Sequence, residues 1–208
     1  PLPYLYLGRQ VFGAARLPYQ ALDALPLAAE PFAAAIDLVF AFVVGEATRA
    51  ATTELLSSAN WTFDVAGRRL AKRDVFAADD HLRELKYVGG WDRLSAIRGA
   101  PEPDSESATG RRARMSPAAR ALQAAEQAAA ALRPMASASS ASAQIESLLA
   151  FISAHETPVV PSDAWYERHS RARAAVLAAL ASLREAHVRF DDAPVPVAEL
   201  AATVRRWI

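Results

Sequence analysis

The sequence predicts a mainly α-helical protein, a multi-helix bundle with at most a short β-hairpin. Through most of the 208 residues, apolar side chains recur three and four positions apart, as in helices that bury one face. Alternation of apolar and polar positions, which indicates a strand, occurs at Trp61, Phe63 and Val65, ahead of an Ala66-Gly67 turn. Because 52% of the residues are hydrophobic, the chain can bury a sizeable core.

Residues 1–25 are expected to form a leading segment. A helix is predicted near the start of the chain from one apolar face, which consists of Tyr4, Leu5, Leu7, Val11, Phe12 and Ala15. Pro18 disfavours the helical conformation at Leu17, so residues 17–22 are predicted to be extended. The chain begins with Pro1 rather than Met and ends inside an amphipathic pattern, so we expect a piece of a longer protein.

Residues 26–100 are predicted to form a helical lobe. Glu30 and Pro31 lie in the first turn of a strongly apolar helix, where a carboxylate is favourable and a proline is tolerated. Asp74 is expected to cap a later helix, and Gly89 with the following glycine to end it. The helices predicted in this lobe cover residues 31–43, 48–58, 75–88 and 91–97.

Residues 101–114 are expected to be a flexible linker, since they contain no large apolar side chain. Residues 115–208 are then predicted to form a second helical lobe. Ser116 followed by Pro117 has the order of a helix start, and the small residues at 137–142 indicate a linker. Shorter helices are predicted from residue 117, over 145–152 and over 197–207.

The longest helix is predicted near residues 163–190, with Ser162 or Asp163 as its cap. Its near-heptad seam is expected to be buried against neighbouring helices. The two histidines on the seam are interpreted as packing residues, because no carboxylate lies on the same stripe to orient a ligand. The seam consists of Trp165, His169, Ala172, Val176, Leu180, Leu183, His187 and Phe190.

The composition restricts the classes of function. The chain has 23 basic and 23 acidic residues, so a contact with DNA would have to be local. The absence of cysteine excludes disulfides, zinc–thiolate sites and a cysteine nucleophile, and it fits a reducing cytoplasm. With no run of 18 apolar residues, we expect no membrane span and no membrane partner.

The sequence contains no recognisable catalytic motif. It has neither a GxxxxGK[ST] loop nor a GxGxxG loop, and its four histidines never occur in HxxxH or HExxH spacing. His81 lies beside Asp79 and Asp80, but neither carboxylate is four residues away, so we interpret the group as a solvated helix face. We therefore expect no catalytic residue, metal site or cofactor in this chain, and no enzymatic activity of its own.

One concentrated basic cluster follows the predicted turn. It consists of Arg68, Arg69, Lys72 and Arg73. Four cations beside an exposed turn are suited to several phosphates, which makes these residues the candidate DNA contacts. The alternative interpretation is a solvated loop that keeps the surface soluble.

A resemblance to a known family lies in residues 4–43, whose sequence is YLYLGRQVFGAARLPYQALDALPLAAEPFAAAIDLVFAFV. This passage resembles the part of superfamily 1 DNA helicases of the UvrD/RecB type that follows helicase motif IV and leads into the inserted domain called 2B. Leu17-Pro18-Tyr19 matches the (I/L)-P-(Y/F) strand of that passage, and residues 27–42 match the helix after it. The LPL..EP pattern and LRELKYVGGWDRL at 82–94 look closest to AddB-like subunits, which carry a PD-(D/E)XK nuclease domain.

The resemblance, good over residues 1–98, implies a non-catalytic 2B-like domain of a bacterial, cytoplasmic ATP-dependent DNA helicase or exonuclease of DNA repair or recombination. Residues 1–25 would then lead out of the parent motor domain, and ATP and Mg would bind only elsewhere in the parent. The implied partners are the rest of that chain, duplex DNA or a second helicase subunit. Two alternatives remain open: an autonomous helical interaction module that binds a partner helix along the 165–190 seam, and a small-molecule-binding bundle.

Overall fold

The computed structural model describes residues 2–16, 27–99, 115–137 and 139–208. Within these ranges it contains nine α-helices, one short 3-10 helix and two antiparallel pairs of two-residue strands, so the predicted mainly α-helical fold is confirmed. The elements are α1 (Leu2–Ala14), η1 (Leu27–Ala29), α2 (Pro31–Val44), α3 (Arg49–Ser57), β1 (Asp64–Val65), β2 (Arg68–Arg69), α4 (Lys72–Glu84), α5 (Trp91–Gly99), α6 (Pro117–Ala136), β3 (Ser139–Ser140), α7 (Ala141–His155), α8 (Tyr166–Phe190), β4 (Pro194–Val195) and α9 (Val197–Trp207).

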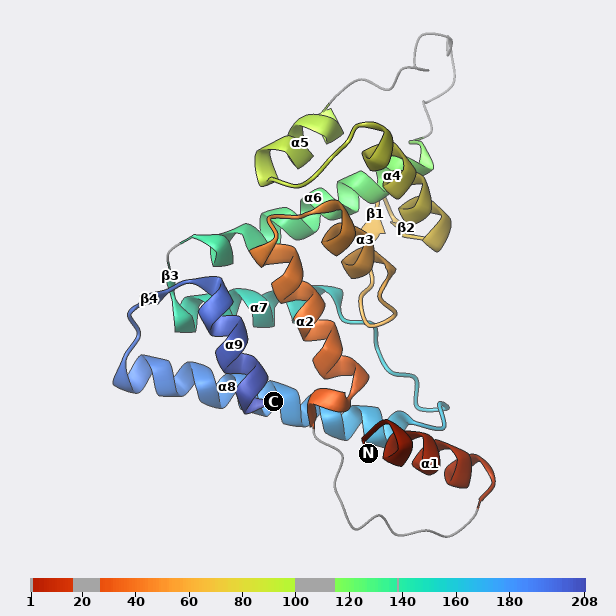
Figure 1. Ribbon diagram of the computed structural model, residues 1–208, viewed down its shortest axis with the longest axis vertical. Helices are drawn as coiled ribbons and strands as arrows, with labels where there is room; N and C mark the ends of the chain where they lie inside the picture. The colour runs from red at the N-terminus through yellow and green to blue at the C-terminus, as the bar shows by residue number, and fades with distance from the viewer. Residues whose placement is uncertain (1, 17–26, 100–114, 138) are drawn as a thin grey trace.

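Three helices lie side by side, and a fourth helix crosses them (Figure 1). The antiparallel helices α6, α7 and α8 lie one beside the next, and α2 crosses them and contacts α6 and α8. On one side α3, α4 and α5 pack on α6, and on the other α9 packs on α2 and α8. No helix in the described ranges combines the length and the apolar content needed to cross a bilayer.

Helix α2 lies at the centre of the core. Eight of its residues are buried, including Val39 and Phe42, which have no exposed surface. The core continues through helices of both predicted lobes, such as α4 and α6. Helices from residues 26–100 and from residues 115–208 therefore share one hydrophobic core. The segment between them lies outside the described residues, as does the segment predicted to be extended at 17–22.

Short hydroxyl side chains fix three helix starts. Thr48 Oγ1 accepts a hydrogen bond from the Ala51 N–H at 3.4 Å, Ser116 Oγ accepts one at the start of α6, and Ser140 Oγ accepts one at the start of α7. These bonds satisfy amide groups that have no partner inside the helix. The cap predicted at Ser116, ahead of a proline, is confirmed.

The predicted role of Asp74 was wrong. Helix α4 begins at Lys72, so Asp74 lies in the third helical position and does not precede the helix. Its Oδ2 accepts a hydrogen bond from the Ala71 N–H at 3.0 Å. The helix also ends at Glu84, before the predicted glycines, because Lys86 adopts a left-handed conformation with φ of 51°.

The long helix ends at Phe190, as predicted, but its start and the exposure of its terminal aromatic residues differ from the prediction. It begins at Tyr166, so neither Ser162 nor Asp163 caps it. Val176, Leu180 and Leu183 are buried as predicted, but Trp165 is 40% exposed and Phe190 is 78% exposed. The ends of α8 extend beyond the helices that cover its centre (Figure 1). The spacing of apolar residues in α8 could not predict this exposure, because it depends on how long the neighbouring helices are.

The segment at 137–142 is not the simple linker that was predicted. Ser139 and Ser140 form strand β3, which pairs with β4 near the end of the chain. Ser142 donates from its backbone N–H and its hydroxyl to the carboxylate of Asp192. These two bonds to Ser142 lower the pKa of Asp192. The small side chains at 137–142 allow β3 to approach β4 closely. The abundance of small residues here therefore reflects packing and not a flexible linker.

Candidate nucleic-acid interface

The candidate site lies on the hairpin formed by β1 and β2. Ala66 and Gly67 link the strands with φ values of 53° and 73°. Positive φ at both loop residues is the geometry of the two-residue turn that best fits the twist of a hairpin. Val65 is paired with Arg68, and Asp64 with Arg69. The predicted turn is therefore confirmed, and Arg68 and Arg69, which follow it, are exposed.

The inner face of the hairpin segment is anchored in the core. Trp61, Phe63 and Val65 are all buried, as their alternation predicts. The Trp61 ring meets Phe151 of α7 edge-on at 5.4 Å between centroids, and the Phe63 ring lies 4.9 Å from the imidazole of His155. These contacts hold the segment against α7, so its outer side chains start from a fixed backbone.

Backbone bonds reinforce this anchoring. The Thr62 N–H donates to the His155 carbonyl at 2.7 Å, and the Thr157 N–H donates to the Asn60 carbonyl at 2.8 Å. His155 Nδ1 also lies 3.2 Å from the Thr62 carbonyl oxygen. Burial lowers the pKa of His155, although the contact with Thr62 acts in the opposite direction. His155 is thus a structural residue beneath the hairpin.

All four predicted DNA-contact residues are exposed, but the structure divides them into two pairs. The side chains of Arg68 and Lys72 form no hydrogen bond or ion pair with any part of the chain that the structure describes. Arg69 donates from Nη2 to Thr62 Oγ1 at 2.8 Å, and Arg73 Nε lies 3.9 Å from Asp74 Oδ1. Arg68 and Lys72 are therefore the cations most available to a ligand.

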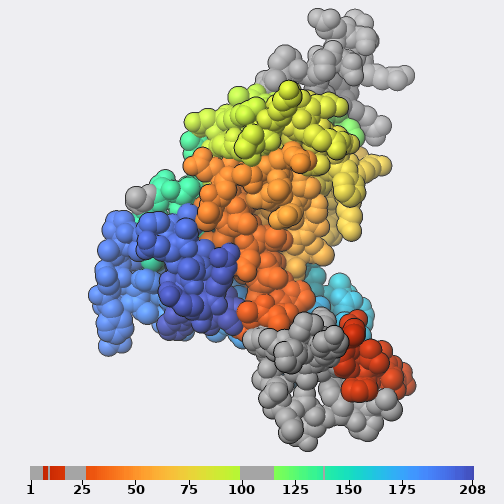
Figure 2. Space-filling view, viewed as in Figure 1, coloured from red at the N-terminus to blue at the C-terminus, as the bar shows by residue number. Residues whose placement is uncertain are grey.

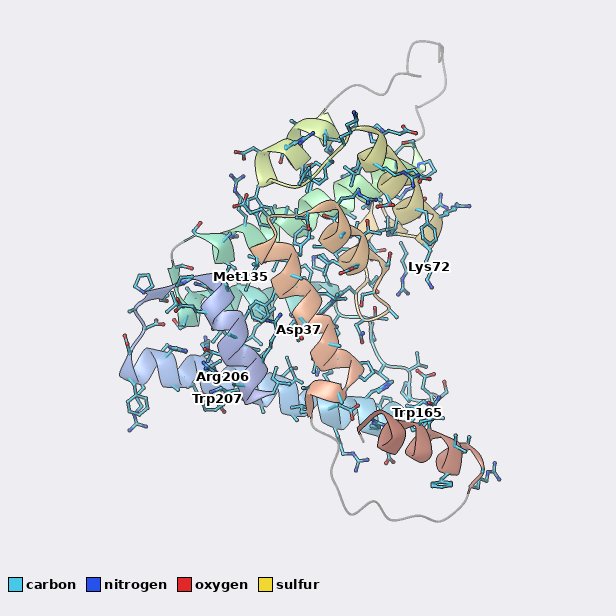
Figure 3. All side chains as sticks on the ribbon, in the orientation of Figure 1. Asp37, Lys72, Met135, Trp165, Arg206 and Trp207 are labelled. Carbon is cyan, nitrogen blue, oxygen red and sulfur yellow. The ribbon has the colours of Figure 1, made fainter. Side chains whose placement is uncertain are left out.

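We define the basic patch as Arg68, Arg69, Lys72 and Arg73. The hairpin and the start of α4 lie at one edge of the molecule (Figure 2), where Lys72 projects from the body (Figure 3). An exposed edge is open to a long, charged polymer.

A buried ion pair fixes the start of α4 behind the patch. Asp74 is fully buried, and its Oδ1 accepts a hydrogen bond from Arg120 Nη1 of α6 at 2.8 Å. Burial acts to raise the pKa of Asp74, but the Ala71 N–H and Arg120 outweigh it and lower the pKa. Because Arg120 compensates this carboxylate, the charge of Arg73 remains largely available at the surface.

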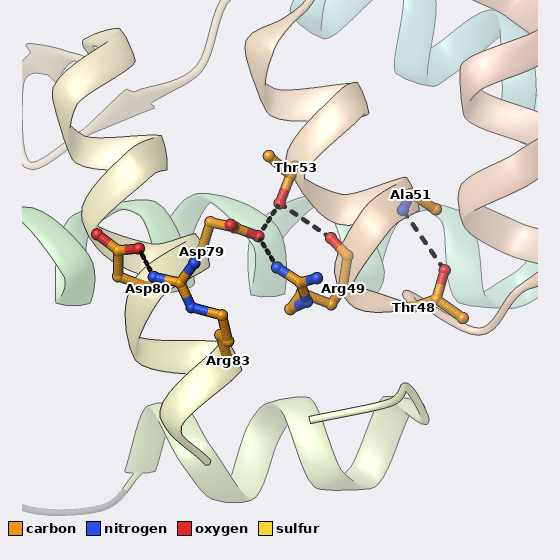
Figure 4. Close-up of polar contacts among 7 residues, drawn as sticks. All are labelled: Thr48, Arg49, Ala51, Thr53, Asp79, Asp80 and Arg83. Carbon is orange, nitrogen blue, oxygen red and sulfur yellow. Dashed lines mark hydrogen bonds and ion pairs between the residues drawn. The ribbon is translucent and has the colours of Figure 1, made fainter. Parts of the chain in front are cut away.

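Two acidic residues further along α4, Asp79 and Asp80, are also paired. Asp79 accepts hydrogen bonds from Arg49 at 2.7 Å and from Thr53 at 3.1 Å, and Asp80 is paired with Arg83 (Figure 4). Asp80 and Arg83 lie on the solvated face that was predicted around His81, whereas the half-buried Asp79 joins α4 to α3. Among the described residues, no group of three or more histidine and carboxylate side chains is placed to hold a metal ion.

Phe76 is a surface residue that the sequence reasoning missed. The buried face of α4 consists of Asp74, Val75, Ala78 and Leu82, whereas Phe76 is 62% exposed. It follows Lys72 by four positions and Arg73 by three, which places all three side chains on one helical face. The spacing from Val75, Ala78 and Leu82 was a signal that could have identified Phe76 as an outward-facing aromatic residue.

Two small pockets lie elsewhere in the described structure. One, of about 190 Å³, lies between α2 and α9 and has Asp37 paired with Arg205 at its rim. The other, of about 40 Å³, contains Glu30 and Glu156, which are paired with Arg168 and Arg173. Drug-sized ligands usually occupy roughly 300–1,000 Å³. The patch, with its available cations, is the stronger candidate site, and its chemistry is suited to binding anions.

The chain matches no protein-family model, no curated protein and no solved structure in the three comparisons.

Proposed function

We propose that this chain is a non-catalytic, 2B-like helical domain of an ATP-dependent DNA helicase or exonuclease of DNA repair or recombination, of the UvrD/RecB type and AddB-like. It positions the motor and contacts duplex DNA through the basic patch. The parent protein, which is bacterial and cytoplasmic in this proposal, binds ATP and Mg outside this chain. Residues 1–25 lead out of the parent's motor domain.

The observation that carries the DNA contact is the exposed pair Arg68 and Lys72 on an anchored hairpin. Neither cation is used within the described structure, and Arg73 retains most of its charge because Arg120 compensates Asp74. Cations of this kind bind phosphates and position a protein on DNA without reading its sequence. The mainly helical fold and the resemblance of residues 4–43 support the assignment to the 2B class.

The test is binding of the chain to a fluorescein-labelled forked duplex at low ionic strength, followed by anisotropy. Changing all four residues of the patch to alanine should abolish this binding. The matched control removes four other exposed cations, none of which lies in the patch: Lys86, Arg171, Arg189 and Arg206. The control variant loses the same net charge, and we expect it to keep at least half of the wild-type affinity. If both variants lose the same amount of affinity, the binding depends on net charge alone and the patch is not a specific DNA contact.

The second candidate function is protein–protein interaction. Its predicted surface, the seam of α8, is buried at Ala172, Val176, Leu180 and Leu183. Because this seam is covered by other helices, the observation that favours a protein partner is the exposed apolar surface of α1, which includes Leu7 and Val11. A partner subunit that binds there should be released by Leu7→Asp with Val11→Asp and retained by the patch variant. The opposite pattern would place the partner on the patch.

A further inference from the structure

An exposed aromatic ring lies beside the basic patch, one helical turn further along α4. Phe76 is 62% exposed, and it makes no ring contact with the part of the chain that the structure describes. A single exposed apolar residue needs no special explanation by itself. Its position is informative because Lys72 and Arg73 lie one helical turn before it on the same face.

The cations around this ring are free to act on a ligand. The ammonium group of Lys72 has no partner within the described residues. Arg73 Nε lies 3.9 Å from the carboxylate of Asp74, which Arg120 already compensates from 2.8 Å. Arg68 adds a third cation from the neighbouring hairpin. The surface therefore combines one accessible aromatic face with positive charge on the side toward the start of α4.

We propose that this surface binds single-stranded DNA, with one unpaired base stacked on Phe76 and the neighbouring phosphates held by Lys72, Arg73 and Arg68. The inference rests on the proposed function and extends it: in addition to the duplex that the basic patch contacts, the surface around Phe76 binds the unpaired strand next to that duplex. An aromatic ring beside cations is the usual combination in proteins that bind single strands. The bases of a duplex are already stacked on each other, so only an unpaired base offers its face to Phe76.

The surroundings of Phe76 favour this ligand over a membrane or an acidic peptide. The exposed face of α4 continues from Phe76 to Asp80 and Arg83, which are charged and paired with each other. Insertion into a bilayer would require burying these charges, which is costly. An acidic peptide would use the cations and leave the ring without a role.

The experiment compares two oligonucleotides of equal length and charge, oligothymidine and a fully abasic strand, bound to the full chain. Base–aromatic stacking contributes about 1–3 kcal/mol, so Phe76→Ala should weaken oligothymidine binding about 5- to 150-fold. Binding of the abasic strand should not change, because the phosphate contacts remain. Phe76→Trp should retain the wild-type preference for the strand with bases.

The matched control is Phe190→Ala. Phe190 is also exposed, and the guanidinium of Arg189 lies 5.3 Å from its ring centroid, so the control removes an aromatic ring beside an arginine at a distant site. This variant should bind both strands like the wild type. Far-UV circular dichroism of each variant establishes that the fold is intact.

Three results would overturn the inference: a wild-type chain that binds the two strands equally, a Phe76→Ala variant that keeps the wild-type preference, or a loss in Phe76→Ala that is equal for both strands. A preference for oligouridine over oligothymidine, or stronger binding to anionic vesicles that depends on Phe76, would also reject single-stranded DNA as the ligand. The proposed duplex contact is tested separately by binding of the four-alanine variant to a blunt duplex, which has no unpaired strand. Its failure would leave a Phe76-dependent preference for unpaired bases standing.

Discussion

Replacing Arg120 with alanine should destabilise the protein by about 3 kcal/mol. Asp74 has no exposed surface, Arg120 is 12% exposed, and their charged atoms are 2.8 Å apart. Removing one partner of a buried ion pair leaves a charge without compensation, which typically costs about 3–5 kcal/mol. Because Arg120 lies near the surface, water can reach Asp74 in the variant, so we expect the lower end of that range.

The same ion pair predicts how this loss depends on pH. Burial raises the pKa of Asp74, but the Ala71 N–H and Arg120 together hold it below the usual 3.8. A lowered pKa in the folded state gives stability that is fully present above pH 3.8 and is lost as the pH falls through the lowered value. Without Arg120 the effect of burial dominates. The difference in stability between wild type and variant should therefore be largest near neutral pH and should shrink below about pH 4.

Urea unfolding followed by circular dichroism measures both effects, provided that the slope of the transition is unchanged. The control is Arg133→Ala, which breaks the pair between Arg133 and Asp92 on the exposed surface. Exposed pairs contribute about 0–1 kcal/mol, so this variant should unfold almost like the wild type. If Arg120→Ala costs no more than Arg133→Ala, or if its cost is the same at pH 3 and pH 7, the buried pair does not anchor α4.

The remaining predictions concern the core, pH and activity. Leu180→Ala removes a buried side chain and should lower the free energy of unfolding by about 2–5 kcal/mol, whereas Phe190→Ala should leave it nearly unchanged; equal effects would refute the assignment of α8 to the core. Burial lowers the pKa of His155, so the protein loses stability as the pH falls from the usual pKa of 6.5 through the lowered value. His155→Gln should reduce this loss in urea titrations at several pH values. An unchanged pH dependence would contradict the assignment of His155 as a buried, neutral residue. The chain should neither hydrolyse ATP nor cleave DNA, and DNA-stimulated release of phosphate above the buffer control would reject the non-catalytic assignment.

Most of the helices could be predicted because periodicity, caps and prolines are local signals. Ser116 with Pro117, and the apolar stripe after Pro31, fixed two helices that the structure contains. The errors have a different origin. The exposure of Trp165 depends on how far neighbouring helices extend, and the pairing of Ser139 with Val195 joins segments far apart in the sequence. No local pattern contains that information.

The candidate site was predicted only in outline. The sequence located the four cations and the turn beside them, but it could not show that Arg120, 46 residues from Asp74, compensates that carboxylate. It also could not show that Arg69 is held by Thr62 while Lys72 is available. Phe76 is different, because its position off the buried stripe of α4 follows from helical spacing and was open to prediction.

The salt dependence of duplex binding tests the central claim most directly. Each phosphate contact contributes about −0.9 to the slope of log affinity against log salt concentration, so the two free cations predict about −1.8 and all four about −3.6. The wild-type chain should fall between these limits, with dissociation constants of about 10⁻⁴ M or weaker at physiological salt. Arg68→Ala with Lys72→Ala should make the slope shallower by about 1.8, while Arg171→Ala with Arg189→Ala should leave it unchanged. A slope that is the same in all three proteins would contradict the claim that the patch contacts DNA.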